Sequence, residues 1–357
     1  MKKGTLLLAN GVELNGFCFG AEGVVVGEVV FTTSAVGYQE ALSDPNYHGQ
    51  ILLQTFPLIG NYGVNDEDYA SDRCHVKGYL VREWCESPSN FRMQGDIDSF
   101  LKKHNIIGLS GIDTRKLTHI LREEGAMNGA IYSGEVDRAA LLQQIKAYRI
   151  ENPVAEVSVK APITFTAETE SYRVAVLDHG YKKSMVNELV KRGCSVTVLP
   201  ALTTAEQIKA IAPDGIVLSD GPGNPADNQQ ELENLKEIVK LGLPMMGVSL
   251  GHQLLAMAMG GKVSKLVHGH RGSSQPVVDL QKSRTFVTAQ NHSYIVENDS
   301  ITPEIGTVSY VNANDRSCEG IDYNEISAFS VQFSPNVISY CAAPESEYDR
   351  FVKMLAK

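Results

Sequence analysis

Residues 244–255 read Pro244-Met-Met-Gly-Val-Ser-Leu-Gly-His-Gln-Leu-Leu255, and this stretch decides the fold of the second half of the chain. An apolar run ends at Gly247, Ser249 follows it, and Gly251 opens a segment with a helical pattern. A Gly-x-Ser-x-Gly sequence at the end of a strand is typical of a nucleophile elbow, a strained turn that lifts one side chain above a sheet. The sequence therefore predicts a strand-to-helix turn with Ser249 at its tip.

The residue at the tip of such a turn determines what the turn can do. A thiol there is partly ionised near neutral pH, whereas a hydroxyl becomes a nucleophile only when a base is held against it. A histidine serves as that base only within hydrogen-bond reach of the hydroxyl. The same stretch could also be a tight turn with no chemistry. The histidines that could supply the base are His252, His268, His270 and His292.

Strands and helices alternate along the segment that leads to the elbow. This alternation predicts βαβ units, and hence an α/β domain with a mostly parallel sheet flanked by helices. The expected strands are 173–177, 195–199, 215–219 and 244–248, and the expected helices between them are 183–192, 205–211 and 228–241.

Ligands of such sheets bind at the carboxyl ends of the strands. Asp178, the loop Asp220-Gly-Pro-Gly-Asn-Pro225 and Ser249 all fall at such ends. The loop lacks the Gly-Lys-Ser/Thr of a nucleotide P-loop, so we do not expect it to bind phosphate. Its exposed N–H groups could instead line a pocket beside the elbow.

The first 150 residues have a different pattern, which predicts a β-rich α+β domain. Short apolar strands with Gly-rich turns fill the first 60 residues, and helical periodicity follows at 96–104 and 114–124. The expected strands include 5–8, 12–14, 17–19, 27–32 and 50–55. Residues 151–171 contain Pro153 and Pro162 and have no clear period, which indicates a linker. The expected domains are therefore 1–150 and 172–357, joined by this linker.

Composition limits the class of protein. The 357 residues suffice for about two domains of ~150 residues each. A net charge of −10 argues against nucleic acid or an anionic membrane as the main partner. No apolar run approaches the ~20 residues of a membrane-spanning helix. The cysteines form no Cys-x-x-Cys pair, zinc framework or disulfide framework, so we expect free thiols in a cytoplasmic protein. Cys18 and Cys194 lie in alternating apolar runs, which predicts core positions for both.

Motifs along nearly the whole chain resemble those of a known family. Four segments follow one another in the order and spacing of class I glutamine amidotransferases: Ser219-Asp-Gly-Pro-Gly-Asn-Pro225, Gly247-Val-Ser-Leu-Gly-His-Gln253, Gln290-Asn-His292 and Phe329-Ser-Val-Gln-Phe333. The first half is similar to the small subunit of carbamoyl phosphate synthetase in the segments 27–32, 33–40, 44–47, 57–63 and 111–118.

This resemblance implies a biochemical role. In that family the small subunit hydrolyses glutamine, and the ammonia passes through an internal tunnel to a large subunit. The large subunit uses ATP and Mg²⁺ to build ammonia and bicarbonate into carbamoyl phosphate for pyrimidine and arginine synthesis. The resemblance thus implies a separate large subunit as partner, L-glutamine as possible ligand, and no cofactor or metal in this chain.

The chain departs from the family at the catalytic residues. Ser249 stands where the family has its nucleophilic cysteine, Ser334 where it has its base histidine, and Asn336 where it has the glutamate that orients the base. Because triad residues act as a unit, losing one can cost nearly as much as losing all three. The sequence therefore predicts that this chain does not hydrolyse glutamine at a useful rate.

The family's glutamine-binding positions are better preserved. Leu250 and the Gly221 loop would supply N–H groups to the oxyanion. Two positions depart: Asn46 replaces a serine, and Ser293 replaces a glycine and could crowd the pocket. The positions that the resemblance assigns to glutamine are Asn46, Gly221, Gly223, Leu250, Gln253, Asn291, Ser293 and Tyr294.

Alternative functions remain open on the sequence alone. The chain could be a non-catalytic scaffold or a glutamine-sensing subunit of an ammonia-dependent synthetase. It could be an active glutaminase in which another residue is the base. It could also be a serine hydrolase, because the order Ser249, Asp279, His292 suits that class. Such an order says nothing about geometry.

Overall fold

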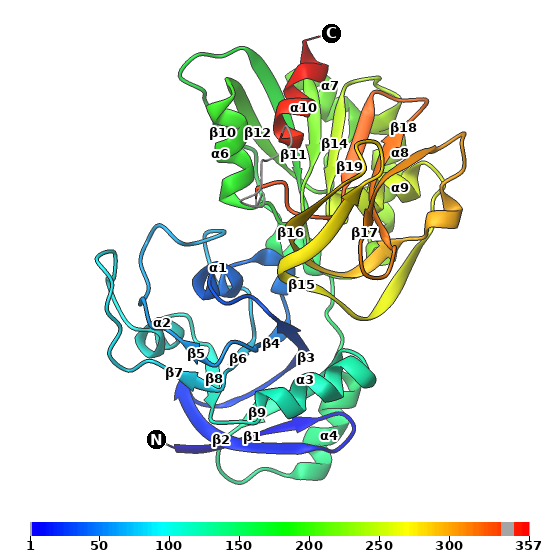
Figure 1. The fold of residues 1–357 in the computed structure, drawn as a ribbon. Coiled ribbons are helices and arrows are strands. Elements are labelled where there is room, and N and C mark those ends of the chain that lie inside the picture. Colours follow the sequence, from blue (N-terminus) through cyan, green and yellow to red (C-terminus); the bar gives the residue numbers. More distant parts are fainter. Residues whose placement is uncertain (1, 337–345, 357) are drawn as a thin grey trace. The chain divides into compact units, whose positions relative to one another are not determined.

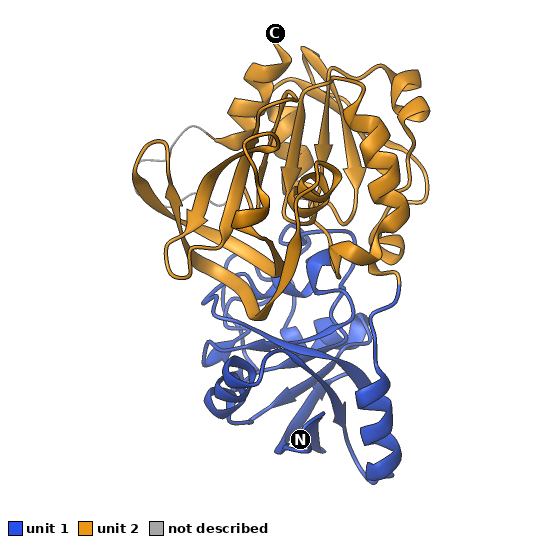
Figure 2. Cartoon of the chain, turned by 90° about the vertical axis from the view of Figure 1, so that its right-hand side faces the viewer, with its two compact units in different colours: residues 1–151 blue, residues 152–357 orange. Residues whose placement is uncertain are grey.

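The chain divides into two units, residues 1–151 and residues 152–357 (Figure 2). The structure is a computed structural model, and it describes residues 2–336 and 346–356. Figure 1 shows the elements of both units along the chain.

The first unit is built on a closed β-barrel. The barrel closes because β1 pairs antiparallel with both β2 and β9. Closure leaves no edge strand free to pair with another chain. In pairing order its strands are β1 (Lys2–Leu8), β2 (Glu13–Gly20), β8 (Ile107–Ser110), β6 (Gly78–Leu80), β4 (Gln50–Gln54), β3 (Val24–Thr32) and β9 (Met127–Tyr132).

Strand β1 shows how the barrel is packed. Leu6 and Leu8 are fully buried in one cluster with residues of the neighbouring barrel strands. Leu7 points the other way and packs against Leu141 and Ile145 of α4 (Arg138–Ala147). Because successive side chains of a strand point to opposite faces, a strand that is apolar at every position must be covered on both sides.

One sequence-based boundary in the barrel was wrong. The sequence predicts two strands, 12–14 and 17–19, separated by Gly16, whereas the structure has the single strand β2. A Cβ at Gly16 would lie 2.2 Å from the Ser110 carbonyl oxygen. The glycine therefore permits close approach of β8 and does not mark a turn.

Helices and a small sheet complete the first unit. The helices predicted at 96–104 and 114–124 are present as α2 and α3, capped by Asp96 and Asp113. The elements outside the barrel are α1 (Tyr38–Leu42), η1 (Pro45–Tyr47), β5 (Leu58–Ile59), β7 (Glu83–Trp84), α2 (Ile97–Lys103), α3 (Thr114–Glu123) and α4 (Arg138–Ala147).

The second unit contains the predicted parallel sheet, extended on one side by antiparallel strands. Strands β12, β11, β13, β14 and β19 run parallel, and β18, β17, β15 and β16 continue the sheet antiparallel. The bounds are β11 (Tyr172–Asp178), β12 (Cys194–Pro200), β13 (Gly215–Leu218), β14 (Met245–Val248), β15 (Val263–Asp279), β16 (Arg284–Val296), β17 (Gly306–Asn312), β18 (Cys318–Tyr323) and β19 (Ala328–Val331).

Both faces of the parallel part are buried. Along β11, Ala175 and Leu177 belong to one apolar cluster with α7, α8 and α9, whereas Val174 and Val176 belong to another with α6 and α10. This burial explains why the strand reads as a continuous apolar run. The helices are α6 (Lys183–Lys191), α7 (Ala205–Ile211), η2 (Pro225–Asp227), α8 (Gln229–Val239), α9 (Leu250–Ala258), η3 (Asn298–Ser300) and α10 (Glu347–Leu355).

The segment expected to be a linker contains regular structure that groups with the second unit. Residues 152–171 include α5 (Pro153–Val157) and β10 (Ile163–Phe165), and β10 pairs antiparallel with β12 at the edge of the sheet. Elements of three and five residues are too short to show a hydrophobic period, which is why the sequence does not indicate them.

The two cysteines that the sequence assigns to the core differ in burial. Cys194 is buried, whereas Cys18 is half-buried at the margin of the barrel core, and both are free thiols. Cys341 lies outside the described residues.

Among the residues that the structure describes, no helix combines the length and apolar character that crossing a membrane requires.

Candidate active site

Ser249 occupies the tip of the turn between β14 and α9. Its backbone is in a strained conformation, with φ 52° and ψ −107°. A non-glycine residue at positive φ is uncommon and is frequently found at functional sites. A Cβ at Gly251 would lie 2.3 Å from the Leu218 carbonyl oxygen, and one at Gly247 would lie 2.8 Å from the Gly251 carbonyl oxygen. Both glycines are therefore needed for the strand and helix to pass so closely.

Ser249 is buried, and its hydroxyl faces a glutamine side chain. The side chain is 5% exposed, and the backbone N–H donates to the Val331 carbonyl at 2.9 Å. The Gln332 amide, Nε2, faces the Ser249 hydroxyl at 3.5 Å, at the outer limit of a hydrogen bond. Within residues 2–336 and 346–356, no histidine is hydrogen-bonded to this hydroxyl. Among the described residues, the side chain that faces the Ser249 hydroxyl is thus an amide.

His252 points into the core. Its Nδ1 lies 2.7 Å from the Ser330 hydroxyl of β19, and burial lowers the pKa of the imidazole to about 3. It is one helical turn from Ser249 but serves to connect α9 with the sheet.

His292 and Asp279 are not brought together as a serine hydrolase requires. His292 contacts the Tyr294 carbonyl and the Gln290 side chain. Asp279 accepts hydrogen bonds from backbone N–H groups of the turn that follows β15. In the β15–β16 pair, Asp279 is opposite Arg284 and His292 is opposite His270, so the two lie at separate points along the strands.

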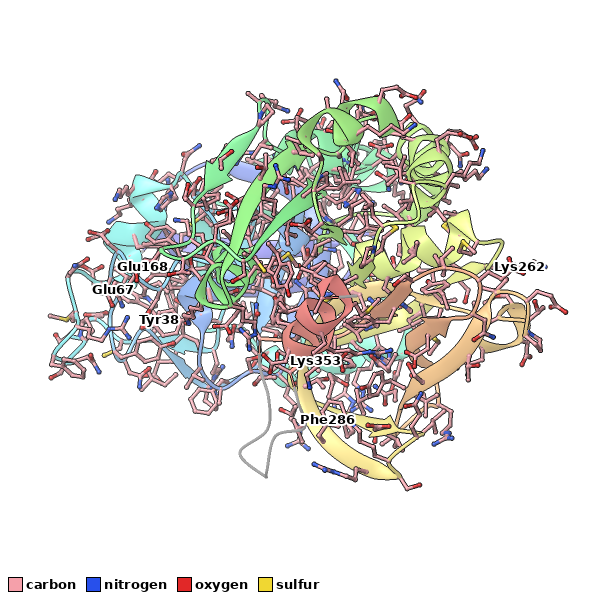
Figure 3. All side chains as sticks on the ribbon, turned by 90° about the horizontal axis from the view of Figure 1, so that it is seen from above. Tyr38, Glu67, Glu168, Lys262, Phe286 and Lys353 are labelled. Atoms are coloured by element: carbon pink, nitrogen blue, oxygen red, sulfur yellow. The ribbon has the colours of Figure 1, made fainter. Side chains whose placement is uncertain are left out.

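The remaining triad positions lie beyond the end of β19. The Ser334 N–H donates to the Ala289 carbonyl at 2.9 Å, and Asn336 Nδ2 donates to the Ser184 hydroxyl at 2.7 Å. Phe333, just before Ser334, packs edge-on against Phe286, which Figure 3 labels, and against Tyr310, with ring centroids 5.6 and 5.5 Å away. The backbone at 334 is thus held firmly, and the Asn336 side chain is engaged by Ser184.

The Gly221 loop packs directly against the elbow. The Gly251 N–H donates to the Ser219 carbonyl at 3.1 Å. A Cβ at Gly221 would lie 2.7 Å from the Leu250 side chain and 2.4 Å from the His179 carbonyl oxygen. The structure therefore places together the two backbone segments that the resemblance assigns to an oxyanion. Gly223 has φ +91°, and a Cβ there would meet the Pro153 ring at 2.4 Å.

Gln253 connects three elements of the expected glutamine pocket. Its amide donates to the Tyr294 carbonyl at 2.7 Å and to the Gln332 side chain at 2.9 Å. It thereby joins α9 to β16, which carries Asn291 and Ser293. Asn46 belongs to the first unit, where its N–H donates to the capping Asp44 side chain of η1.

Arg271 is a residue of this region that the sequence analysis did not identify. Its guanidinium is hydrogen-bonded to the Ser293 hydroxyl and donates to the His268 carbonyl at 2.8 Å, and the residue is 4% exposed. An arginine inside the long strand 263–279 is the signal that could have drawn attention to it, since arginine is rarely buried without partners. The hydroxyl that Ser293 adds to the site is thus engaged by a buried cation.

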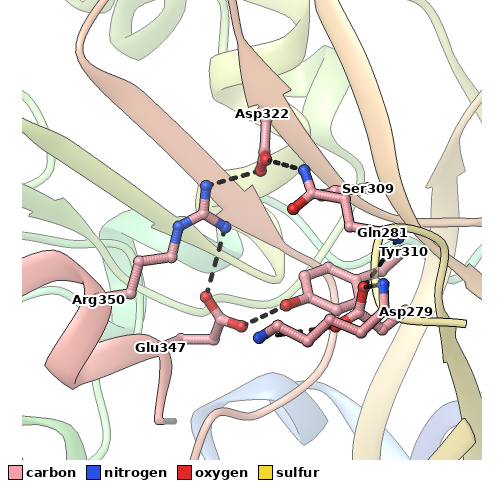
Figure 4. A pocket seen from close by; sticks show the side chains of 8 residues that line it. Asp279, Gln281, Ser309, Tyr310, Asp322, Glu347 and Arg350 are labelled. Atoms are coloured by element: carbon pink, nitrogen blue, oxygen red, sulfur yellow. Dashed lines mark hydrogen bonds and ion pairs between the residues drawn. The ribbon is translucent and has the colours of Figure 1, made fainter. Parts of the chain in front are cut away.

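A charged pocket of about 140 Å³ lies elsewhere in the second unit (Figure 4). Arg350 of α10 pairs with Asp322 at 2.8 Å and lies 3.7 Å from Glu347, which accepts a 2.7 Å hydrogen bond from Tyr310. Gln281 donates to Asp322 at 3.0 Å. These contacts connect α10 to the antiparallel strands. Its lining residues are Asp279, Gln281, Lys282, Ser309, Tyr310, Asp322, Glu347 and Arg350.

Both halves of the chain match family models. Residues 6–131 match the carbamoyl-phosphate synthase small chain, CPSase domain, and residues 175–354 match glutamine amidotransferase class-I.

The chain is also similar over nearly its whole length to curated proteins that are each called carbamoyl phosphate synthase small chain. It is 42% identical over 356 residues to that of Listeria monocytogenes serotype 4b (strain F2365), covering 99% of this chain and 97% of the relative. It is 43% identical over 353 residues to that of Bacillus cereus (strain ATCC 10987 / NRS 248), covering 99% and 95%. It is 42% identical over 354 residues to that of Clostridium perfringens (strain 13 / Type A), covering 98% and 99%.

Proposed function

This chain belongs to the family of carbamoyl phosphate synthase small chains, and from that premise we propose that it is a subunit that no longer hydrolyses glutamine at a useful rate. One observation carries the proposal: the group that faces the Ser249 hydroxyl is the Gln332 amide, at 3.5 Å. A primary amide donates hydrogen bonds through its nitrogen and cannot accept the proton of a nucleophile there.

The chemistry of the other two positions supports the same proposal. A serine hydroxyl at 334 has no basic lone pair near neutral pH, and the Asn336 amide carries no charge that could stabilise an imidazolium. A thiol in place of Ser249 would be partly ionised without help, but a hydroxyl is not. The elbow, the oxyanion segments and the sheet persist around a centre without a nucleophile.

The role that remains is that of a scaffold. We expect the chain to bind a separate large subunit that uses ATP, Mg²⁺, bicarbonate and free ammonia to make carbamoyl phosphate for pyrimidine and arginine synthesis in the cytoplasm. The retained contacts of Gln253 with Tyr294 and Gln332 favour a second candidate, a subunit that senses glutamine without cleaving it.

The decisive experiment uses this chain reconstituted with its own large subunit. Carbamoyl phosphate synthesis from glutamine and from ammonium is compared at equal ATP and bicarbonate, with the large subunit alone as control. We expect synthesis from ammonium only. A glutamine-dependent rate close to the ammonium-dependent rate would reject the proposal and reopen the search for a base among the histidines.

A further inference from the structure

Three potential metal ligands from three strands converge in the second unit. They are His270 of β15, His292 of β16 and Glu319 of β18, and their ligand atoms all lie within 4.8 Å of one another. His270 and His292 are directly opposite in the β15–β16 pair, with ring centroids 5.1 Å apart. His270 Nδ1 lies 3.6 Å from Glu319 Oε1, and Glu319 is fully buried.

The outer hydrogen bonds of both histidines turn a lone pair toward this cluster. His270 Nε2 lies 2.8 Å from the Asp315 carboxylate, so that nitrogen carries the proton and Nδ1 faces Glu319. His292 Nδ1 lies 2.8 Å from the Tyr294 carbonyl, so Nδ1 carries the proton and the lone pair is on Nε2. Histidines that bind metals are oriented in this way, by a carboxylate or a backbone carbonyl on the far nitrogen.

On the inner side of the cluster, hydrogen-bond acceptors face one another without enough donors. His292 Nε2, with its lone pair, lies 3.0 Å from Gln290 Oε1, which is also an acceptor. Gln290 Nε2 donates to Glu319 Oε2 at 2.8 Å. If the amide were turned over, its oxygen would face Glu319 Oε2, which can donate a hydrogen bond only when the carboxyl is protonated.

A protonated His270 would not remove this conflict. That proton would point from Nδ1 toward Glu319, while His292 and Gln290 would still face each other through lone pairs. A cation placed among all four side chains satisfies every lone pair at once.

We propose that His270 Nδ1, His292 Nε2 and Glu319 bind a zinc ion, with Gln290 Oε1 as a fourth ligand. Zinc accepts histidine nitrogen and carboxylate oxygen at about 2.0–2.2 Å in a tetrahedral arrangement, which puts neighbouring ligand atoms about 3.3 Å apart. The ligand atoms lie within 4.8 Å of one another, so the site requires adjustments of up to about 1.5 Å, within reach of side-chain rotation. Asn312 Nδ2 donates to Glu319 at 3.1 Å and completes the support of the carboxylate.

The zinc would act as a structural clamp on the strand that carries Asn291 and Ser293. Successive residues of a strand point to opposite faces, so these two side chains project away from His292. The β15–β16 register is interrupted between Lys265 and His270 and again between Gly272 and Gln275. A metal between His270 and His292 would fix the register where the ladder is weakest. The inference does not depend on whether the chain hydrolyses glutamine.

The test is zinc binding to the purified full-length chain. The protein is treated with a chelator, dialysed, and titrated with zinc chloride by calorimetry, and its metal content is measured by mass spectrometry after gel filtration. We expect about one zinc per chain with submicromolar affinity, because metal sites with preformed ligands bind tightly at neutral pH. Binding of less than about 0.1 equivalent by the folded wild-type chain would overturn the proposal.

Variants locate the site. His270→Gln and Glu319→Gln should abolish stoichiometric zinc binding, and His268→Gln on the same strand should retain it. Because a change at the buried Glu319 could prevent folding, Asp315→Asn provides a milder variant at an exposed position. It removes the carboxylate that orients His270 and should weaken zinc affinity about tenfold or more while circular dichroism stays unchanged. Unchanged affinity in Asp315→Asn, or zinc retained in a folded Glu319→Gln protein, would contradict the assignment.

Discussion

Gln332 Nε2 lies 3.5 Å from Ser249 Oγ, so the side chain that faces this hydroxyl ends in an amide. The amide is held there because its oxygen accepts a hydrogen bond from Gln253 at 2.9 Å. Under the proposed function, this arrangement orients the serine without activating it, since proton transfer requires an acceptor.

Restoring the three side chains together should restore glutamine hydrolysis. We expect Ser249→Cys alone to change glutamate release by less than about tenfold, because an isolated thiol lacks its base and orienting carboxylate. The triple variant Ser249→Cys/Ser334→His/Asn336→Glu should raise the rate by about 100-fold or more. Glutamate release by the chain with its large subunit is the measurement, and Ser334→His/Asn336→Glu is the control. Equal rates for the single and triple variants would show that positions 334 and 336 do not reach the nucleophile.

Removing the Ser293 side chain should strengthen glutamine binding. The Ser293 hydroxyl is engaged by the buried Arg271, so Ser293→Gly frees both space and the guanidinium. We expect the Kd for L-glutamine, measured by calorimetry, to fall about fivefold, a change typical of one small group in a pocket. Ser293→Ala separates the two effects, because it removes the hydroxyl and keeps the Cβ. An unchanged Kd in both variants would place Ser293 outside the glutamine site.

The elbow should not tolerate an added methyl group at Gly251. A Cβ there would lie 2.3 Å from the Leu218 carbonyl oxygen, so Gly251→Ala forces a backbone shift that costs about 1–3 kcal/mol. Gly242→Ala is the matched control in the same unit. Gly242 has φ +69° with nothing within 4 Å of its Cβ position. Gly242→Ala therefore costs only the strain of a side chain at positive φ, about 1 kcal/mol, without a steric clash. Thermal unfolding of the two variants is compared, and equal midpoints would mean that the turn relaxes freely.

Stability should fall as the pH drops below about 6.5, in part because of His252. Burial lowers the pKa of His252 to about 3, whereas the unfolded chain has an ordinary histidine pKa of 6.5. Between these values the unfolded state binds the additional proton, so the contribution is complete above pH 6.5 and is lost as the pH falls toward 3. One such group changes the free energy of unfolding by at most about 1.4 kcal/mol per pH unit.

The measurement is urea unfolding of wild type and His252→Gln between pH 7.5 and 4.5. The variant loses the contact with Ser330 and should be less stable at pH 7.5. Its free energy of unfolding should change less steeply with pH than that of the wild type, by the slope that the uptake of about one proton on unfolding produces. Parallel pH profiles for the two proteins would show that His252 is not the group that titrates.

The sequence by itself determined the parallel sheet, the elbow and the residue types at positions 249, 334 and 336. Strands buried on both faces read as apolar runs, and a strand-to-helix turn needs small residues beside its tip, so both features are written locally. The side-chain types at the triad positions also fix what they cannot do, whatever their distances. Gly16 shows the limit of such reasoning, because its role depends on the Ser110 carbonyl of another strand.

Only the tertiary structure decided which groups face one another. The pairing of Ser249 with Gln332, of Arg271 with Ser293, and the convergence of His270, His292 and Glu319 all join residues far apart in the sequence. These contacts depend on the register of β15, β16 and β18, which is shifted by irregularities in the ladder. A shift of one residue turns a strand's side chains to the opposite face, so no local pattern could have predicted them.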